Sequence, residues 1–326
     1  MSTESSVPPS KRPVKRMPDV LGIDTSNYTT SAALLRSGTI RQSKKLLPVR
    51  PGEKGLRQSD AVFHHVQQLP EVLDALPFAE AKIGAVGVSN RPRSIEGSYM
   101  PCFLVGISAA KAAALSLGVP LHVFSHQQGH IAAALYSAGK LGLLRESFLA
   151  FHVSGGTTEA VLCKPDKAGI FSTAVVAQSL DLKAGQAVDR VGVMLGLSFP
   201  AGPELEKLAL QTAKTFRIRP TMKGADCSLS GVENRCQTML VHGVPKEEIA
   251  AFCLQSVLAA LDDMAACLLK EYGNLPLLFA GGVMSNSILR TALSQKYGAY
   301  FAEPAFSADN AAGVAVLAAL KEGVAL

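Results

Sequence analysis

The sequence lacks several features, and each absence removes a class of protein. The 326 residues include no Trp, and charged side chains make up only 18% of them. That composition does not fit a disordered chain, a coiled coil or collagen. No uninterrupted run of about 18 apolar residues occurs, so no membrane span is expected. The chain is 48% hydrophobic and contains 28 Gly, as a compact α/β protein would.

The cysteines form no disulfide or zinc framework. There are six and none belongs to a CxxC pair. Thiols scattered through apolar or helical segments are typical of a reducing compartment. The N-terminus also lacks the apolar stretch of a secretory signal. We therefore expect reduced thiols and a cytoplasmic protein. The six are Cys102, Cys163, Cys227, Cys236, Cys253 and Cys267.

The net charge is small and unevenly distributed. Lys and Arg number 32 against 26 Asp and Glu, which gives +6. Residues 1–17 contribute +3 of this total, and they contain Pro and Ser but almost nothing apolar. We expect this segment to be a disordered basic tail. The folded part is left with a charge that barely supports a nucleic-acid partner.

The length suggests two domains, and the apolar pattern shows where one lobe gives way to the next. We predict an N-terminal lobe over 18–125 and a C-terminal lobe over 126–326, whose last helix could return to the first lobe. Predicted strands include 83–88, 121–124 and 275–279, and predicted helices include 103–117, 246–272 and about 309–322.

The two halves open in the same way. Residues 29–34 match 157–162, and in the same alignment Ser26 falls on Ser154. Each copy reads as a strand, a small polar break and a second strand. Two interpretations remain: a duplication that produced two lobes, or a chance match between two hairpins.

The sharpest local motif is HxxxH at His126 and His130. On a helix, residues four apart share one face, which is the spacing for two imidazoles on one metal ion. The alternative is that one histidine caps a helix and the other packs. A zinc peptidase is disfavoured because Gln127 stands where that motif needs Glu.

Three further segments carry glycines and polar side chains. In 152–158, glycines and hydroxyls would either admit a ligand or form a plain hairpin turn. In 185–203, Asp189 would accept hydrogen bonds from ligand hydroxyls or pair with Arg190. In 281–286, a glycine pair follows a strand and precedes Asn286, a weak phosphate-site pattern.

Asp309 stands at the start of the predicted last helix. An Asp in such a place is most commonly an N-cap. It would equally serve as an oxygen ligand beside the two histidines. Sequence separation does not decide between these roles.

Taken in order, these segments resemble the TsaD/Gcp family, the threonylcarbamoyl transferases of tRNA modification once labelled glycoproteases. The resemblance runs from about Val20 to the C-terminus. The matching pieces are GIDTS, HxxxH, VSGG, GxxxD with its PxGP sequel, CSLSG, GGVxxN and ADN. Each motif is weak alone, whereas seven in order are specific.

The resemblance implies an α/β actin-like ATPase (ASKHA) fold, with two duplicated lobes around a central ligand cleft. It implies that His126, His130 and Asp309 hold one divalent metal ion, iron or zinc. It also implies an adenine nucleotide or acyl-adenylate substrate. The residues implied to line that pocket are His152, Val153, Ser154, Gly155, Gly156, Asp189, Gly202 and Asn286.

The implied reaction moves a threonylcarbamoyl group from its adenylate to the exocyclic amine of the adenosine beside the tRNA anticodon. The amine is the nucleophile, so the protein need not supply one. Asp24 is the carboxylate that we nominate as general base. The implied partners are tRNA and either TsaB-like and TsaE-like proteins or a second copy of the chain; no membrane is implied.

The chain departs from the family at several polar positions. Tyr28 and Thr29 stand where the family has two carboxylates, and Asn27 stands where it has Cys. Gln128 and Gln186 replace Glu, and Thr157 replaces His. Arg91 and Arg93 flank Pro92 where the family has Gly-Pro-Gly, which makes them candidates for a phosphate contact. This pattern suggests a divergent paralogue.

Two alternative functions follow from this divergence. One is a small-molecule kinase or carbamoyltransferase on the same fold. The other is a non-catalytic or regulatory subunit of the tRNA-modification complex. Retention of His126, His130 and Asp309 favours the metal-dependent transferase.

Overall fold

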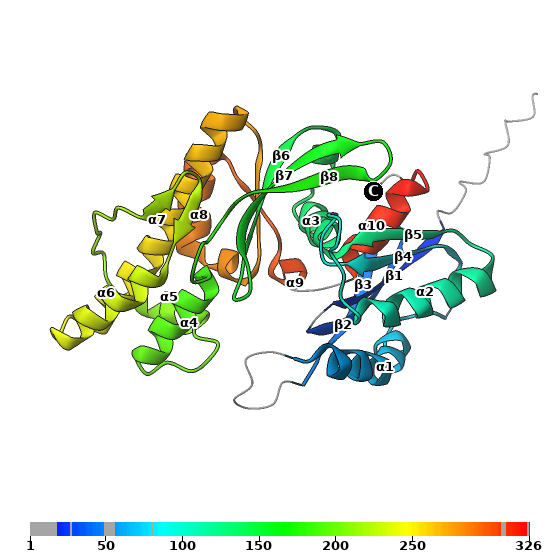
Figure 1. The fold of residues 1–326 in the computed structure, drawn as a ribbon, viewed down its shortest axis with the longest axis horizontal. Helices are drawn as coiled ribbons and strands as arrows, with labels where there is room; N and C mark the ends of the chain where they lie inside the picture. Colours follow the sequence, from blue (N-terminus) through cyan, green and yellow to red (C-terminus); the bar gives the residue numbers. More distant parts are fainter. Residues whose placement is uncertain (1–17, 27, 49–55, 80, 308–310, 325) are drawn as a thin grey trace, which may run out of the picture.

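The computed structural model describes residues 18–26, 28–48, 56–79, 81–307, 311–324 and 326. The expected tail over 1–17 lies outside these residues. The described chain forms two α/β lobes, each built on a five-stranded sheet (Figure 1). This confirms the α/β class and the two-lobed architecture.

The first lobe contains a sheet with strand order β3-β2-β1-β4-β5. Strands β1, β2 and β3 form antiparallel hairpins, whereas β1, β4 and β5 run parallel. The elements are β1 (Asp19–Ser26), β2 (Thr29–Arg36), β3 (Thr39–Leu46), α1 (Gln58–Asp74), β4 (Ile83–Arg91), α2 (Phe103–Leu117) and β5 (Leu121–Ser125).

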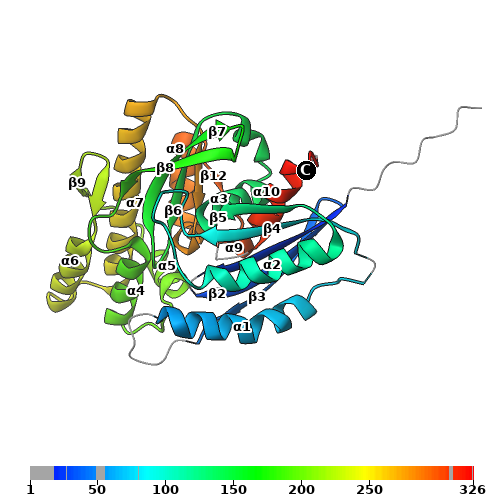
Figure 2. The same ribbon diagram turned by 45° about the vertical axis from the view of Figure 1, so that its right-hand side comes forward.

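Side-chain alternation along β1 explains why helices cover both faces of this sheet. Leu21 and Ile23 pack with apolar side chains of α1 and α2 on one face. Val20 packs on the other face with the last helix, α10 (Ala312–Lys321). Figure 2 shows α1 and α2 along the sheet. A Cβ on Gly87 of β4 would clash with the Val314 carbonyl, so glycine lets α10 approach closely.

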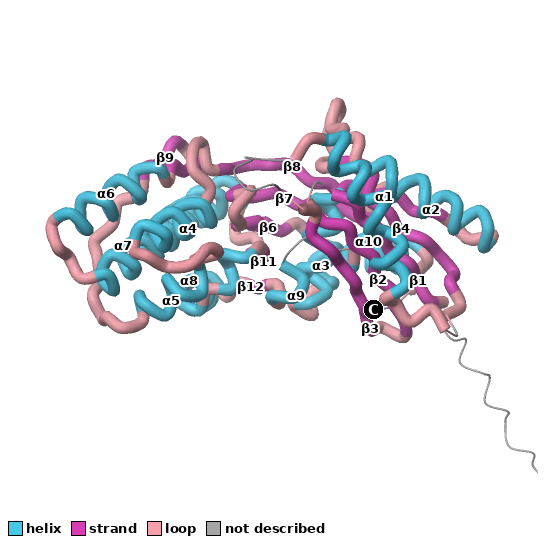
Figure 3. The backbone as a smooth tube through the Cα atoms, turned by 90° about the horizontal axis from the view of Figure 1, so that it is seen from below, coloured by secondary structure: helices cyan, strands magenta, loops and turns pink. Residues whose placement is uncertain are grey.

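The second lobe repeats this frame with the order β12-β11-β6-β7-β8. Its helices α4 to α8 gather at the end of the molecule away from α1 and α2 (Figure 3). The strands and short pairs are β6 (Phe148–Val153), β7 (Thr158–Asp166), β8 (Ile170–Gln178), β9 (Thr221–Lys223), β10 (Asp226–Ser228), β11 (Leu277–Ala280) and β12 (Tyr300–Phe301). The helices are α4 (Ala184–Met194), α5 (Gly202–Ala209), α6 (Ser230–Val241), α7 (Lys246–Tyr272) and α8 (Ser287–Tyr297).

The two sheets correspond strand for strand. Hairpin β1–β2 matches β6–β7, β3 matches β8, and the parallel strands β4 and β5 match β11 and β12. The pair Asp24–Ser31 across the first hairpin corresponds to His152–Glu159 across the second. The duplication predicted from the internal sequence match is therefore present in the fold.

Two helices occupy the region between the sheets. Side chains of α3 (His126–Ser137) and α10 share one apolar cluster with residues of both lobes, among them Val20, Ala133, Phe148 and Val314. The lobes are thus joined by a continuous core. Short helical turns complete the chain at η1 (Leu141–Arg145), η2 (Gly282–Ser285) and α9 (Pro304–Ser307).

Several sequence predictions are confirmed at this level. Helices α2 and α7 have the predicted bounds, and all six cysteines are free. Within the described residues, α7 is the one helix long and apolar enough to cross a membrane. More than half of the most apolar stretch of this helix is buried in the second lobe, as expected of a core helix.

Candidate functional site

A cavity of about 430 Å³ opens in the second lobe where strands β6 and β11 end. In open α/β sheets, ligands bind beyond the carboxyl ends of the strands. Four residues singled out from the sequence line it, and they come from four separate segments. They are Gly155, Asp189, Gly202 and Asn286.

The VSGG motif forms the tight turn between β6 and β7. The Ser154 backbone N–H donates to the Thr157 carbonyl at 2.7 Å. The Ser154 hydroxyl accepts hydrogen bonds from the N–H groups of Gly156 and Thr157. The segment is therefore a hairpin turn, and its Gly155 also forms part of the cavity wall.

Four other residues expected at the pocket are not among those that line this cavity: His152, Val153, Ser154 and Gly156. Successive side chains of a strand point to opposite faces. Val153 is buried in the core of the second lobe, while the His152 ring faces α3. Ser154 organises the turn, and Gly156 is exposed at its tip.

The glycine pair after β11 has a steric origin. Gly281 has φ +103°, a conformation that L side chains rarely adopt, and a Cβ there would collide with the Val153 carbonyl. Glycine thus allows the end of β11 to lie against the end of β6. Gly282, Val283 and Ser285 then form one wall of the cavity.

Asp189 links two walls of the cavity. Its Oδ1 accepts a hydrogen bond from the Ala201 N–H at 2.9 Å, which ties α4 to the start of α5. The suggested pairing with Arg190 is wrong, because the Arg190 guanidinium pairs with Glu233 at 2.9 Å. Adjacent helical residues diverge by about 100°, so they do not face one another.

Asn286 is the N-cap of α8. Its Oδ1 accepts from the Leu289 N–H at 3.1 Å, so the side-chain amide nitrogen remains for a ligand. Beside it, the Glu206 carboxylate accepts from the Ser287 N–H at 2.7 Å.

Glu206 and Leu254 also line the cavity, and neither was singled out from the sequence. The signal for Glu206 was its position shortly after Pro203 on α5. Leu254 belongs to the distant helix α7 and has no local motif.

A cluster of histidines lies between the lobes. The rings of His126 and His130 on α3 have centroids 4.3 Å apart, and the His152 ring from β6 lies 4.9 Å from that of His130. The i, i+4 spacing therefore does bring the two α3 histidines together, as predicted. His152 joins them from the strand equivalent to β1.

Asp24 reaches this cluster from the first lobe. Its Oδ2 lies 2.9 Å from His126 Nδ1, its Oδ1 accepts from the Ser89 hydroxyl, and the residue is only 1% exposed. Both carboxylate oxygens are thus engaged. This arrangement orients the His126 ring.

The described residues include only part of the metal-ligand set that the resemblance implies. An imidazole ligand commonly holds a carboxylate with its other ring nitrogen, as His126 does with Asp24, so this histidine fits a metal. No group of three or more His, Cys, Asp or Glu suited to a metal forms among the described residues. Asp309, the expected third ligand, lies outside them.

Two departures from the family motifs have structural explanations. Gln128 caps α3 by accepting from the Ser125 N–H at 3.0 Å, and its Nε2 donates to the Phe171 carbonyl at 2.9 Å. A carboxylate could not make that second bond, because it has no proton to donate. Arg93, a candidate phosphate contact, pairs instead with the buried carboxylate of Glu159. That interpretation of Arg93 is therefore corrected.

A buried polar network supports the first hairpin behind Asp24. The Thr30 hydroxyl lies 2.8 Å from His65 Nδ1 and donates to the Gln68 side-chain oxygen at 2.9 Å. Burial of the ring lowers the pKa of His65 to about 4. The imidazole is therefore neutral at pH 7.

Solved structures show the fold. The chain superposes on full-length HypF in its phosphate- and nucleotide-bound form with a TM-score of 0.59 at 15% identity, covering 95% of this chain and 56% of that one. It superposes on component A of the (R)-2-hydroxyglutaryl-CoA dehydratase of Acidaminococcus fermentans with a TM-score of 0.54 at 16% identity, covering 94% and 99%. These neighbours confirm the actin-like ATPase fold.

Sequence comparison gives a narrower result. The family model "tRNA N6-adenosine threonylcarbamoyltransferase" matches residues 49–316. A protein of that name from Thermosipho africanus is 33% identical and covers 91% of this chain and 92% of its own length. Another from Thermus thermophilus is 30% identical, covering 92% and 91%.

Proposed function

We propose that this protein transfers a threonylcarbamoyl group to tRNA, because the chain belongs to the tRNA N6-adenosine threonylcarbamoyltransferase family. The donor is threonylcarbamoyl adenylate, and the acceptor is the exocyclic amine of the adenosine beside the anticodon. The observation that carries the proposal is the convergence of Gly155, Asp189, Gly202 and Asn286 on one cavity in a lobe that also contributes to the histidine cluster.

The cavity suits the adenylate half of the donor. Its walls are mainly glycines and apolar side chains, which allow a flat base and a ribose to approach the backbone. Asp189 and Glu206 supply carboxylate oxygens for ribose hydroxyls, and the Asn286 amide nitrogen supplies a donor.

The histidine cluster suits the phosphate end. His126 and His130, together with Asp309, would hold one divalent ion, iron or zinc, whose charge would help to neutralise the donor phosphate. The engagement of Asp24 by His126 and Ser89 supports a positioning role for this carboxylate, in place of the general base expected from the sequence.

The proposed transfer needs no nucleophile from the protein, because the acceptor amine attacks the donor directly. The adenosine amine forms a bond to the carbamoyl carbon, the bond from that carbon to the phosphate oxygen breaks, and AMP leaves with the electron pair. The amine proton passes to solvent or to the departing phosphate. The protein contributes binding and orientation, which hold the two reactants in line.

Complementation tests this function. In a strain without its own transferase, the wild-type gene should restore threonylcarbamoyladenosine, measured by mass spectrometry of tRNA nucleosides. His130→Ala should restore none, and the exposed-turn variant Gly156→Leu should restore it. Expression with and without TsaB-like and TsaE-like partners shows whether they are required. No restoration under either condition would contradict the proposal and favour a regulatory role.

A further inference from the structure

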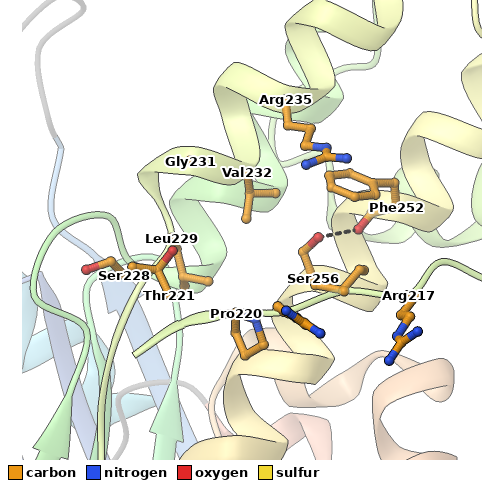
Figure 4. A pocket seen from close by; sticks show the side chains of 12 residues that line it. Arg217, Pro220, Thr221, Ser228, Leu229, Gly231, Val232, Arg235, Phe252 and Ser256 are labelled. Carbon is orange, nitrogen blue, oxygen red and sulfur yellow. Dashed lines mark hydrogen bonds between the residues drawn. The ribbon is translucent and has the colours of Figure 1, made fainter. Parts of the chain in front are cut away.

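A second cavity, of about 470 Å³, lies in the same lobe but away from the histidine cluster. It is formed by the segment 217–221, the start of α6 and one side of α7 (Figure 4). Three arginines line it, Arg217, Arg219 and Arg235, and none of its described lining residues carries a carboxylate. The proposed transfer uses none of these residues.

Helix α7 separates this cavity from the adenylate cavity. Phe252 and Ser256, one turn apart, line the arginine cavity, whereas Leu254 lines the other. Because each residue turns a helix by about 100°, Leu254 points away from the face that carries Phe252 and Ser256. The two cavities are therefore separate sites on opposite sides of one helix.

The sequence pattern before β9 directs two arginines outward. Phe216, Ile218 and Met222 pack against the core of the lobe, whereas Arg217 and Arg219 are exposed. This alternation is that of an extended chain, in which residues two apart share a face and lie about 7 Å from one another. Arg217 and Arg219 thus leave the chain on the same side and both line the cavity.

Arg235 on α6 adds the third guanidinium. Its Cζ lies 5.6 Å from the centre of the Phe252 ring, and Figure 4 shows the two groups adjacent. Stacking on an aromatic ring fixes the guanidinium while leaving its N–H edge available. The apolar side chains of Leu229 and Val232 also line the cavity.

Nearby carboxylates are bound to other groups. Glu233 pairs with Arg190 at 2.9 Å, and Glu248 pairs with Lys214 at 2.6 Å. Asp181 accepts from the Leu229 N–H at 2.7 Å. Within the part of the chain that the structure describes, no ion pair neutralises the three arginines of the cavity, which therefore keeps a local excess of positive charge.

We propose that this cavity binds backbone phosphates of the acceptor RNA. The inference rests on the proposed function, since it assumes that the acceptor is tRNA. Planar guanidinium groups bind phosphate through paired N–H donors, and two of them at strand-like spacing suit a chain of phosphates better than a single ion. The apolar lining residues Leu229, Val232 and Phe252 suit a sugar or base beside the phosphates.

The test measures tRNA binding by the full-length protein with fluorescence anisotropy, over a range of salt concentrations. The triple variant Arg217→Gln/Arg219→Gln/Arg235→Gln should bind tRNA at least tenfold more weakly near physiological salt. Its negative slope of log affinity against log salt should become shallower by roughly 2, since each lost phosphate contact removes about 0.7 to 0.9 from the magnitude of the slope. A matched control, Arg41→Gln/Lys111→Gln/Arg145→Gln, removes the same charge from exposed positions elsewhere and should keep the wild-type slope.

The outcomes separate the two proposals. If the wild-type protein modifies tRNA but the triple variant binds it with an unchanged slope, the phosphate site is wrong and the function stands. If the wild type neither binds nor modifies tRNA, the function itself fails. AMP titration gives a second arm: an unchanged AMP affinity in the triple variant supports RNA as the phosphate source, and a lost affinity would assign the cavity to a free nucleotide instead.

Discussion

The two hairpins that open the lobes have one topology but differ at one matched pair of positions, 24 and 152. Thr30 and its equivalent Thr158 are both buried, at 0% and 1% exposed. Asp24 is 1% exposed, whereas its equivalent His152 is half-buried. The turn that follows β6 also contributes Gly155 to the wall of a cavity. Duplication thus supplied one frame twice, with a buried carboxylate in the first copy and a cavity wall in the second.

Asp24 of the first hairpin and its equivalent in the second, His152, also differ in how deeply they are buried. Asp24 and His152 occupy matching places, and both reach histidines of α3. Asp24 is fully buried between His126 and Ser89, whereas His152 is half-buried. The buried copy should therefore matter more for stability, and the open copy more for binding.

The largest expected effect comes from Asp24→Ala. Removing this carboxylate leaves His126 and Ser89 without their buried partner, which should lower the free energy of unfolding by about 3 kcal/mol. Urea denaturation measures the loss. His152→Ala is the matched control in the second copy, with an expected loss of about 1 kcal/mol. Equal losses would remove the distinction between the two hairpins.

An intermediate effect concerns the pH dependence of the first hairpin. Burial lowers the pKa of His65 to about 4. As the pH falls below about 6.5, His65 becomes protonated in the unfolded chain but stays neutral in the folded protein until about pH 4. The free energy of unfolding therefore decreases between about pH 6.5 and 4. His65→Gln should reduce the loss of unfolding free energy between pH 7 and 4.5 by about 2 kcal/mol.

The control for this prediction is His64→Gln on the same helix. His64 is only half-buried and makes an edge contact with Phe63. We expect its pH profile of stability, from urea denaturation at each pH, to match that of the wild type. A wild-type profile for His65→Gln would show that the buried network does not depend on a neutral ring.

Substitutions in the turn between β6 and β7 should have the smallest effect on stability. One of them should nevertheless weaken ligand binding clearly. A Cβ on Gly155 or on Gly156 meets no atom within 4 Å, but only Gly155 lines the cavity. Gly155→Leu should weaken AMP binding at least tenfold in isothermal titration calorimetry while shifting the unfolding free energy by less than about 0.5 kcal/mol. Gly156→Leu should bind AMP normally; a similar loss in both variants would place the nucleotide elsewhere.

The sequence predicted what depends on local pattern. The apolar periodicity of α2 and α7 was enough to give their bounds. The match of 29–34 with 157–162 left duplication and chance open, and the two corresponding sheets confirm the duplication. The family resemblance, and not the local pattern, implied one pocket for Gly155, Asp189, Gly202 and Asn286, and the structure places these four around one cavity.

What the sequence did not predict depends on which way side chains face across separate elements. Strand alternation turns His152 away from the cavity and toward α3. Leu254 enters the cavity from the middle of α7, which carries no motif of its own, and Arg93 is neutralised by Glu159 from the other lobe. Such pairings follow from the packing of the lobes, which no local motif encodes.

The most direct test of the central claim is a single-turnover reaction of the purified protein with threonylcarbamoyl adenylate and tRNA. Threonylcarbamoyladenosine in the tRNA and free AMP are measured together, with the TsaB-like and TsaE-like proteins present. We predict that both products form in equal amounts with the wild type, and that neither forms with His126→Ala. Release of AMP without any modified adenosine would contradict transfer to tRNA.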